Sequence, residues 1–171
     1  MRTAAHQHGL TLIELMVVVV LLGITAAIAV PNFGRMIDTN QHAAAANDFS
    51  GLLQYARSEA IRRSNSVAVF PLGNSSAGYG VCPVSALASC KGDPAAAELL
   101  RTSNPLAGRV TITQTAPAGG GDLIFRGSGT LGAGANHTYR ICGGAGTEAV
   151  DITVNAGGQT RMDTDTNVTC S

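Results

Sequence analysis

The feature that most constrains this chain of 171 residues is a continuous apolar segment near its start. Residues 10–30 (LTLIELMVVVVLLGITAAIAV) contain a single charged side chain, Glu14. At about 1.5 Å rise per residue, a helix of this length spans about 31 Å, which is enough to cross the apolar core of a bilayer. The segment therefore predicts a membrane-spanning helix. Arg2 lies on the leader side and favours a cytoplasmic leader, with the remainder of the chain outside.

Three interpretations of this segment are open: a cleaved secretory signal peptide, an uncleaved anchor, and an assembly helix in which Glu14 has a function. A signal peptide would be cut at 27–29, but its apolar stretch is usually about 7 to 15 residues long and needs no carboxylate. An acid inside a membrane is by default a functional residue with a partner. If the leader is cut after Gly9, Leu10 supplies a new α-amino group four residues before Glu14. The amine of Leu10 and the carboxylate of Glu14 can pair within one helix or between neighbouring helices, and only pairing between helices builds a polymer.

After Pro31 the apolar residues recur on one side at helical spacing, which predicts that the helix leaves the membrane and lays one face on a domain. These positions are Phe49, Leu52, Leu53, Ala56 and Ala60. Pro31 is expected to kink or locally interrupt the helix. Basic residues and turn formers at 62–65 are expected to end it.

The remaining residues predict short strands separated by turns and glycine-rich loops. The expected strands are Val67–Phe70, Arg109–Thr113, Leu123–Arg126, Thr138–Cys142, Val150–Val154 and Gln159–Met162. Apolar and polar residues alternate at 110–113 and 152–155, which predicts sheets with one buried face and one solvent-exposed face. The predicted fold class is α+β, with a long N-terminal helix packed on a small antiparallel sheet head. The segments expected are a leader (1–9), a membrane helix (10–30), its amphipathic continuation (31–63) and a β-rich head (64–171).

Motifs for catalysis or cofactor binding are weak. Residues 127–132 match G-x-G-x-x-G after a predicted strand, but a strand follows them instead of the helix that would hold a pyrophosphate. His42 and His137 have no partner at a metal-ligand or catalytic spacing and are expected at the surface. The formal net charge of zero gives no overall preference for nucleic acid or acidic lipid. We therefore expect no enzyme, metal site, cofactor or small-molecule substrate.

All four cysteines lie beyond residue 80, in the part predicted outside the cytoplasm, so disulfides are favoured over metal ligation. Four cysteines allow three pairings. Loop closure favours Cys82 with Cys90 and Cys142 with Cys170. The second pair would hold the C-terminus on a strand of the head.

The residues Gly9-Leu10-Thr11-Leu12-Ile13-Glu14-Leu15, followed by the apolar run and Pro31, resemble the class III leader and N-terminal helix of type IV pilins and type II secretion pseudopilins. The resemblance implies that a prepilin peptidase in the membrane cuts after Gly9 and that Leu10 is then methylated. It also implies that Glu14 sets the register between subunits. Leu10 departs conservatively from the phenylalanine that is usual in this family.

The head resembles the GspH/FimT type in three places. These are Tyr55–Ala60 at the end of the helix, Leu123–Gly129 in a strand and turn, and a C-terminal strand pair formed by 152–155 and 158–161. The second cysteine pair also resembles the disulfide-bounded C-terminal region of many pilins. The resemblance therefore implies a pilin fold along most of the chain.

The function that the resemblance implies is that of a minor pilin, incorporated into a type IV pilus as an initiation or tip subunit that supports twitching motility. Its partners would be other major and minor pilins or pseudopilins, the prepilin peptidase and the inner membrane. It would cross the inner membrane once with its head in the periplasm and then join the fibre. Two alternatives stay open: a minor pseudopilin of a type II secretion system, and a DNA-binding minor pilin for natural transformation.

Some proteins of this group bind DNA through a C-terminal G-R-x-R motif, and the corresponding stretch here is Gly158-Gln159-Thr160-Arg161. Gln159 stands in place of the first arginine, which removes one phosphate contact and lowers the non-specific affinity. The candidate DNA-contacting residues are Arg161, Arg140 and Arg126.

Overall fold

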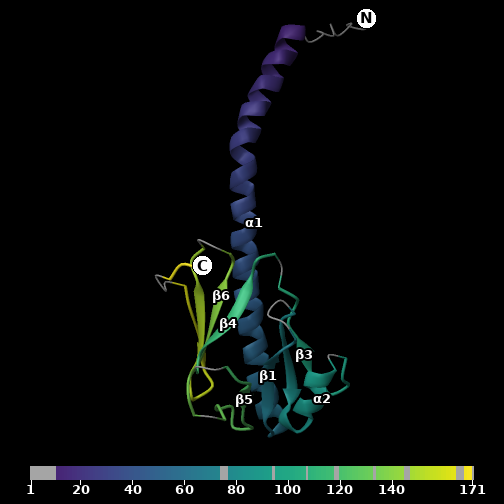
Figure 1. Cartoon of the computed structure of the whole chain (residues 1–171), viewed down its shortest axis with the longest axis vertical. Coiled ribbons are helices and arrows are strands. Elements are labelled where there is room, and N and C mark those ends of the chain that lie inside the picture. The colour runs from purple at the N-terminus through teal and green to yellow at the C-terminus, as the bar shows by residue number, and fades with distance from the viewer. Residues whose placement is uncertain are drawn as a thin grey trace, which may run out of the picture. The chain divides into compact units, whose positions relative to one another are not determined.

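The computed structural model describes residues 11–73, 77–93, 95–106, 108–117, 120–132, 134–144, 147–164 and 168–170 (Figure 1). Gly9 and Leu10, the predicted cleavage and methylation residues, lie outside the described residues. The chain divides into two compact units, Met1–Ile37 and Asp38–Ser171. We describe each unit by itself and call the second one the head.

Helix α1 (Leu12–Arg63) begins in the first unit and ends in the head. In the first unit, Leu12–Val30 is long and apolar enough to cross a membrane, with a mean hydropathy of 2.7. All side chains of this segment are exposed. Of the two effects predicted at Pro31, the interruption is wrong, because the backbone stays helical past it, and the kink stays a prediction. Proline removes one helical hydrogen bond, but its φ of about −65° is close to the helical value, and the flanking turns are long.

In the head, the remainder of α1 is amphipathic and supplies one wall of the core. The apolar positions predicted from helical spacing are each at most 1% exposed; they are Phe49, Leu52, Leu53, Ala56 and Ala60. The one-sided pattern is therefore confirmed. The helix ends at Arg63, inside the predicted stop, and the next residue, Ser64, has a positive φ of 51°.

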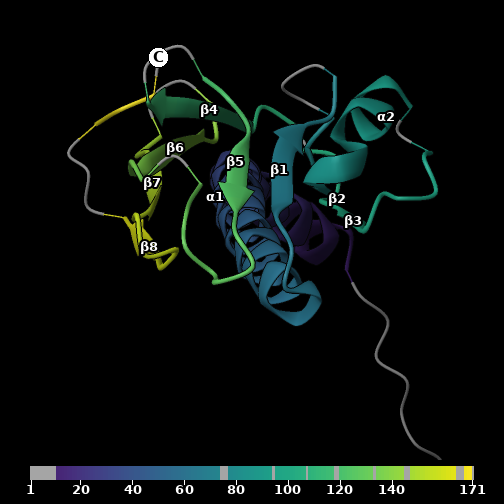
Figure 2. The same ribbon diagram turned by 90° about the horizontal axis from the view of Figure 1, so that it is seen from below.

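In its described residues, the head contains two four-stranded antiparallel sheets, in agreement with the small antiparallel sheet head expected. The strands are β1 (Val67–Pro71), β2 (Tyr79–Pro83), β3 (Arg101–Thr102), β4 (Thr111–Ala116), β5 (Leu123–Phe125), β6 (His137–Cys142), β7 (Val150–Val154) and β8 (Thr160–Asp163). Their orders are β3-β2-β1-β5 in the first sheet and β4-β6-β7-β8 in the second. Viewed from below, β6, β7 and β8 of the second sheet lie to the left of α1 and β2 and β3 of the first sheet to its right, with β5 drawn across the helix (Figure 2). Buried residues of α1 and both sheets form one core.

Some elements differ from the prediction. β2 and β3 were not expected, nor were the short helix α2 (Leu87–Gly92) and the 3₁₀ turn η1 (Val84–Ala86) before it. β4 covers 111–116 instead of 109–113, because its ladder with β6 begins at the Thr111–Cys142 pair. β3 and β4 pair with strands that are distant in sequence, β2 and β6, whereas β2 forms a hairpin with the neighbouring β1.

Three aromatic rings join the helix to both sheets. The centroid of Phe49 on α1 lies 4.8 Å from that of Tyr79 on β2 and 5.0 Å from that of Tyr139 on β6. The two tyrosine centroids are 6.0 Å apart, with the rings nearly perpendicular. Such tilted and edge-to-face pairs are favourable arrangements for aromatic rings. Phe49 therefore lies at the centre of the head.

Two disulfides close the peripheral segments of the head. Cys82 on β2 is bonded to Cys90 on α2, and Cys142 at the end of β6 is bonded to Cys170. These are the two pairs that loop closure favours. The first lies in a small second core with Phe70. The second attaches the C-terminal segment, whose Cys170 amide also donates to the Thr147 carbonyl at 2.9 Å.

Candidate functional site

Glu14 lies at the third position of α1 and caps the start of its own helix. The backbone amide and the hydroxyl of Thr11 each donate to Glu14 Oε2 at 3.0 Å. The Glu14 amide donates in return to Thr11 Oγ1 at 3.3 Å. This is a capping box, which satisfies amide groups that a helix start leaves without partners. The T-x-x-E spacing was visible in the sequence, but it was not used there to place a partner for Glu14.

Arg57 joins the three head stretches that resemble the GspH/FimT type. Its Nε donates to the Gly129 carbonyl at 3.0 Å, and a terminal nitrogen donates to the Gly157 carbonyl at 3.2 Å. Arg57 belongs to the helix stretch and Gly129 ends the strand-turn stretch. Gly157 directly precedes the C-terminal stretch 158–161. The three stretches, which are far apart in the sequence, therefore meet at Arg57 in the folded head.

The glycines at this contact are needed for space. A Cβ on Gly158 would lie 2.0 Å from the Gly129 carbonyl oxygen, and one on Gly127 would lie 2.5 Å from the carbonyl carbon of Ser64. Gly158 and Gly129 also have φ values of +75° and +80°, which side chains disfavour. The first residue of the stretch Gly158-Gln159-Thr160-Arg161 is therefore glycine for a structural reason.

Residues 127–132 form a tight turn instead of a nucleotide loop. The turn is closed by the bridge between Phe125 and Leu131 and by the Gly129 amide, which donates to the Arg126 carbonyl at 2.7 Å. The described residues 134–136 are not helical, and β6 begins at His137. Nor do the described residues include a group of three or more His, Cys, Asp or Glu side chains placed to hold a metal ion.

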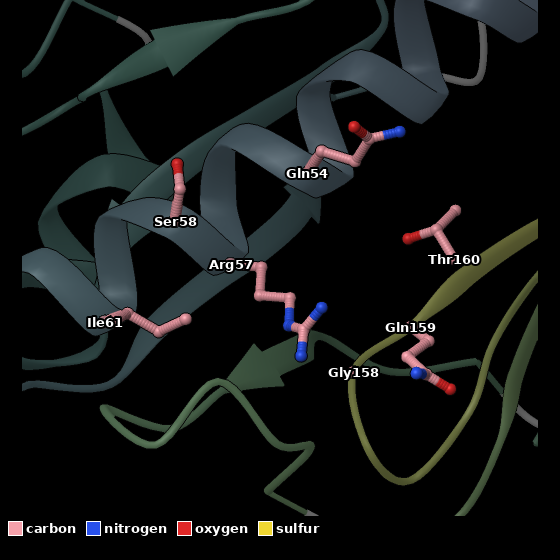
Figure 3. Close-up of a pocket in the computed structure, with 7 residues that line it drawn as sticks. All are labelled: Gln54, Arg57, Ser58, Ile61, Gly158, Gln159 and Thr160. Carbon is pink, nitrogen blue, oxygen red and sulfur yellow. The ribbon is translucent and has the colours of Figure 1, made fainter.

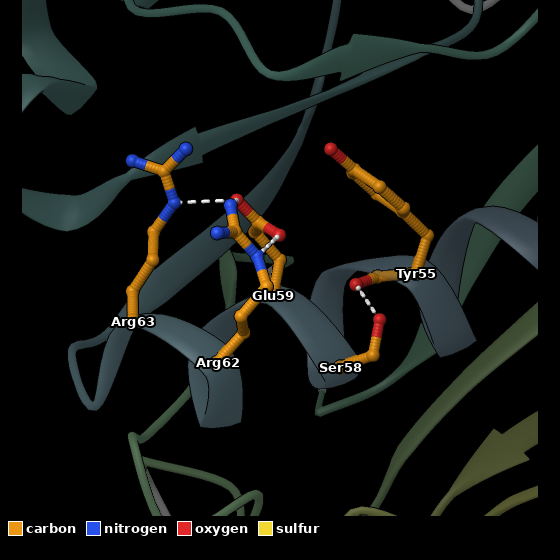
Figure 4. Close-up of polar contacts among 5 residues, drawn as sticks. All are labelled: Tyr55, Ser58, Glu59, Arg62 and Arg63. Carbon is orange, nitrogen blue, oxygen red and sulfur yellow. Dashed lines mark hydrogen bonds and ion pairs between the residues drawn. The ribbon is translucent and has the colours of Figure 1, made fainter.

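Glu59 is a nearly buried carboxylate at the end of α1, held by two arginines (Figure 4). Arg62 Nε donates to Glu59 Oε2 at 2.8 Å, and Arg63 Nε donates to Oε1 at 2.5 Å. Hydrogen bonds from Arg62 and Arg63 lower the pKa of Glu59 to about 2. The carboxylate is therefore ionised at neutral pH. On the same helix, the Tyr55 ring lies under the guanidinium of Arg101, 5.2 Å from ring centroid to Cζ.

A groove of about 420 Å³ lies between α1 and the turn that connects β7 to β8 (Figure 3). Its residues, together called the Arg57 groove, are Gln54, Arg57, Ser58, Ile61, Gly158, Gln159 and Thr160. Figure 3 shows the Arg57 side chain directed from the helix towards Gly158 and Gln159. The groove therefore adjoins the contact that holds the head together.

The three candidate DNA-contacting arginines have different surroundings. Arg140 on β6 forms two hydrogen bonds with Asp151 on β7, at 2.8 and 2.7 Å, which compensate its charge and raise its pKa. Arg161 on β8 shares this outer face and pairs in register with Thr153. Arg126 follows β5 in the other sheet. The second sheet thus brings Arg140 and Arg161 to one face, without Arg126.

His42 and His137 are both buried, so their predicted surface position is wrong. His42 is 8% exposed and its Nε2 lies 2.9 Å from the Ile141 carbonyl oxygen. His137 is 4% exposed, and its ring stacks on Tyr139. The distance from its Nδ1 to the Gln114 amide nitrogen is 3.0 Å. These polar contacts make burial tolerable. Burial also lowers the pKa of His137, which is therefore neutral at pH 7.

Comparisons with known proteins match both parts of the chain. The family model described as type II transport protein GspH matches residues 45–158. The prokaryotic N-terminal methylation motif matches residues 4–30. No curated protein sequence matches the chain.

Solved structures share its fold. The type IV minor pilin FimU of Pseudomonas aeruginosa (strain PAO1) is 22% identical with a TM-score of 0.62, covering 80% of this chain and 97% of that chain. A second crystal form of FimU is 23% identical with a TM-score of 0.58, covering 75% and 97%. The minor pseudopilin EpsH of the type 2 secretion system of Vibrio cholerae is 14% identical with a TM-score of 0.54, covering 74% and 99%.

The long N-terminal helix, the two-sheet head and the methylation motif define a pilin-like protein of the type IV pilin and pseudopilin class. Within that class, the chain belongs to the GspH family. The predicted α+β pilin fold and the resemblance to the GspH/FimT type are thus confirmed. Proteins of this family and fold are structural subunits that assemble with other pilins or pseudopilins.

Proposed function

We propose that this protein is a minor pilin, which enters a type IV pilus through α1 and supports pilus assembly and twitching motility. The observation that carries the proposal is the exposed apolar segment Leu12–Val30, which has one carboxylate at its start and lies within the match to the methylation motif. Lipid can cover this segment before assembly, and neighbouring helices can cover it in a fibre. A soluble domain would have no use for such a surface.

Glu14 would change partners during assembly. A charged carboxylate costs about 2.5 to 3.5 kcal/mol at the membrane centre and less towards the helix start, where Glu14 lies, so a compensating group still favours its burial in the membrane. Both hydrogen bonds from Thr11 end on Glu14 Oε2. Oε1 is therefore the oxygen that can accept from the methylated amine of Leu10 on a neighbouring subunit. Cleavage after Gly9 by the prepilin peptidase would create that amine directly before Thr11.

The location that we propose is a single pass through the inner membrane, with the head in the periplasm before it joins the fibre. Arg2 on the leader side favours this orientation. The two disulfides of the head suit an oxidising compartment outside the cytoplasm.

The test is Glu14→Ala in the full-length protein, expressed in its own cells. We expect leader cleavage and head folding to be unchanged, while the amount recovered in sheared fibres falls to background. Normal incorporation would refute the assembly role of Glu14. Loss of the whole gene should abolish twitching and spare protein secretion, and the reverse result would identify a type II secretion pseudopilin instead.

A further inference from the structure

Arg57 differs from the other arginines near the end of α1 in how its charge is compensated. Arg62 and Arg63 form ion pairs with Glu59, whereas no carboxylate in the described part of the chain forms an ion pair with Arg57. Its partners are the neutral carbonyls of Gly129 and Gly157. Carbonyl dipoles compensate a half-buried cation less completely than a carboxylate does. Arg57 thus has capacity for an anion.

The groove around Arg57 presents further hydrogen-bond donors. A guanidinium has five N–H donors, and the carbonyls of Gly129 and Gly157 use two of them. Gln159 Oε1 accepts from Asn155 Nδ2 at 3.0 Å, which leaves the Gln159 amide nitrogen for the groove. Figure 3 shows that nitrogen on the side of Arg57, with the Thr160 hydroxyl and the Gln54 amide above it.

The size and the apolar edge of the groove fit a side chain better than a polymer. The volume is about 420 Å³, and Ile61, which is 49% exposed, lines one end. A carboxylate matches the planar edge of a guanidinium with two parallel hydrogen bonds. A nucleic acid gains affinity from many phosphate contacts, and this groove has one cation. A single carboxylate next to a few apolar atoms is therefore the ligand that the chemistry favours.

We propose that the Arg57 groove receives an aspartate or glutamate side chain from a neighbouring pilin subunit. This inference rests on the proposed function, because a fibre holds neighbouring heads at a high effective concentration. The incoming carboxylate accepts from Arg57 and from the amide nitrogen of Gln159, and the aliphatic part of the same side chain packs on Ile61. The groove thus adds a head-to-head contact to the helix contacts made by α1.

The first experiment places a competing carboxylate in the groove and leaves Arg57, which holds the loops, unchanged. In Gln159→Glu, the new carboxylate has nearly the shape of the native amide and still accepts from Asn155. We expect leader cleavage and head stability to be unchanged, and the amount of the full-length protein in sheared fibres to fall about tenfold. Ser89→Glu, at an exposed position of α2, is the matched control and should incorporate normally.

The second experiment identifies the partner. A photo-crosslinking residue at Gln54, in the full-length protein in native membranes and fibres, should link to a pilin subunit next to an aspartate or glutamate. Changing that carboxylate to lysine in the partner should lower incorporation of the wild-type protein about tenfold. Combining the same change with Gln159→Glu should restore incorporation, because the charges are exchanged.

The outcomes separate the groove from the proposed function. Normal incorporation of Gln159→Glu, a crosslink to DNA or lipid, no crosslink, or a crosslinked segment without a carboxylate would each overturn the groove proposal. Glu14→Ala is measured in parallel. If the Glu14→Ala protein is absent from sheared fibres while the Gln159→Glu protein incorporates normally, only the groove proposal fails. If Glu14→Ala also incorporates normally, the proposed assembly role of α1 fails.

Discussion

The two parts of α1 have the same backbone and opposite surroundings. In the first unit, the apolar side chains from Leu12 to Val30 are all exposed. In the head, apolar residues from Ala46 to Ala60 on one face of the same helix are almost fully buried. The first part thus depends on other molecules to cover it, and the second is covered within its own chain. Helix formation alone does not reveal which of these applies, because the difference lies in the side chains and their partners.

Stability and assembly depend on different parts of α1. Burial of apolar surface stabilises the head, so substitutions in its core should act on unfolding. The segment from Leu12 to Val30 contributes no buried side chain, so substitutions there should act on membrane retention and incorporation. All three tyrosines lie after residue 54, so tyrosine fluorescence of the full-length protein in detergent reports unfolding of the head.

The largest expected effect contrasts two phenylalanines of α1. Phe49 is 1% exposed and touches both tyrosine rings of the core, whereas Phe33 is 64% exposed. Phe49→Ala should lower the free energy of unfolding of the head by about 3 to 5 kcal/mol, because it leaves a cavity. Phe33→Ala should leave it unchanged. Urea unfolding followed by tyrosine fluorescence checks both, and equal effects would contradict the division of the helix.

Much of the fold was predictable from the sequence because it depends on local patterns. The apolar run, the helical spacing of Phe49 and its neighbours, and the alternation at 150–154 were enough to place α1 and β7. β2 was missed because its sequence, YGVCP, has no alternation of apolar and polar residues; what makes it a strand is its hairpin pairing with the neighbouring β1. The second sheet likewise follows from pairing, which local propensity does not specify.

The candidate site was predictable only in part. The T-x-x-E spacing of the cap at Glu14 was visible in the sequence. The helical spacing of the buried His42, which precedes Ala46 and Phe49 by four and seven residues, was visible too. The same is true of His137, which is two residues before Tyr139 and lies on the same buried face of β6. The Arg57 groove was not, because residues 57, 129 and 157 meet only in the folded head.

The next effect concerns the glycines that let the head close around Arg57. Gly158→Ala would place a Cβ 2.0 Å from the Gly129 carbonyl oxygen, at a φ of +75°. We expect a loss of about 1 to 3 kcal/mol in the free energy of unfolding. Gly73→Ala is the matched control, since its φ is +68° but nothing lies within 4 Å of its Cβ. A loss for Gly73→Ala as large as that for Gly158→Ala would mean that backbone strain, and not the close approach, is responsible.

A smaller effect should depend on pH. The arginines at 62 and 63 lower the pKa of Glu59 from 4.5 to about 2, so the folded carboxylate binds its proton at a lower pH than the unfolded one. Its contribution to stability is therefore complete above pH 4.5 and is lost as the pH falls towards 2. Glu59→Gln should lower the free energy of unfolding by about 0.5 to 1 kcal/mol at pH 7. The difference between the two proteins should shrink between pH 4.5 and pH 3; a constant difference would contradict this assignment.

The smallest effect uses two helical glycines, one in each part of α1. Gly51 and Gly23 both have open space at the Cβ position. An alanine in place of a helical glycine reduces the conformational entropy of the unfolded chain and stabilises the folded state by about 0.4 to 1 kcal/mol. Gly51→Ala should therefore raise the free energy of unfolding of the head by this amount. Gly23→Ala should leave head unfolding unchanged, because the exposed segment around it does not unfold together with the core. If Gly23→Ala raised it as much as Gly51→Ala, the two parts of α1 would unfold as one cooperative unit, and the separation between an assembly segment and a self-contained head would have to be abandoned.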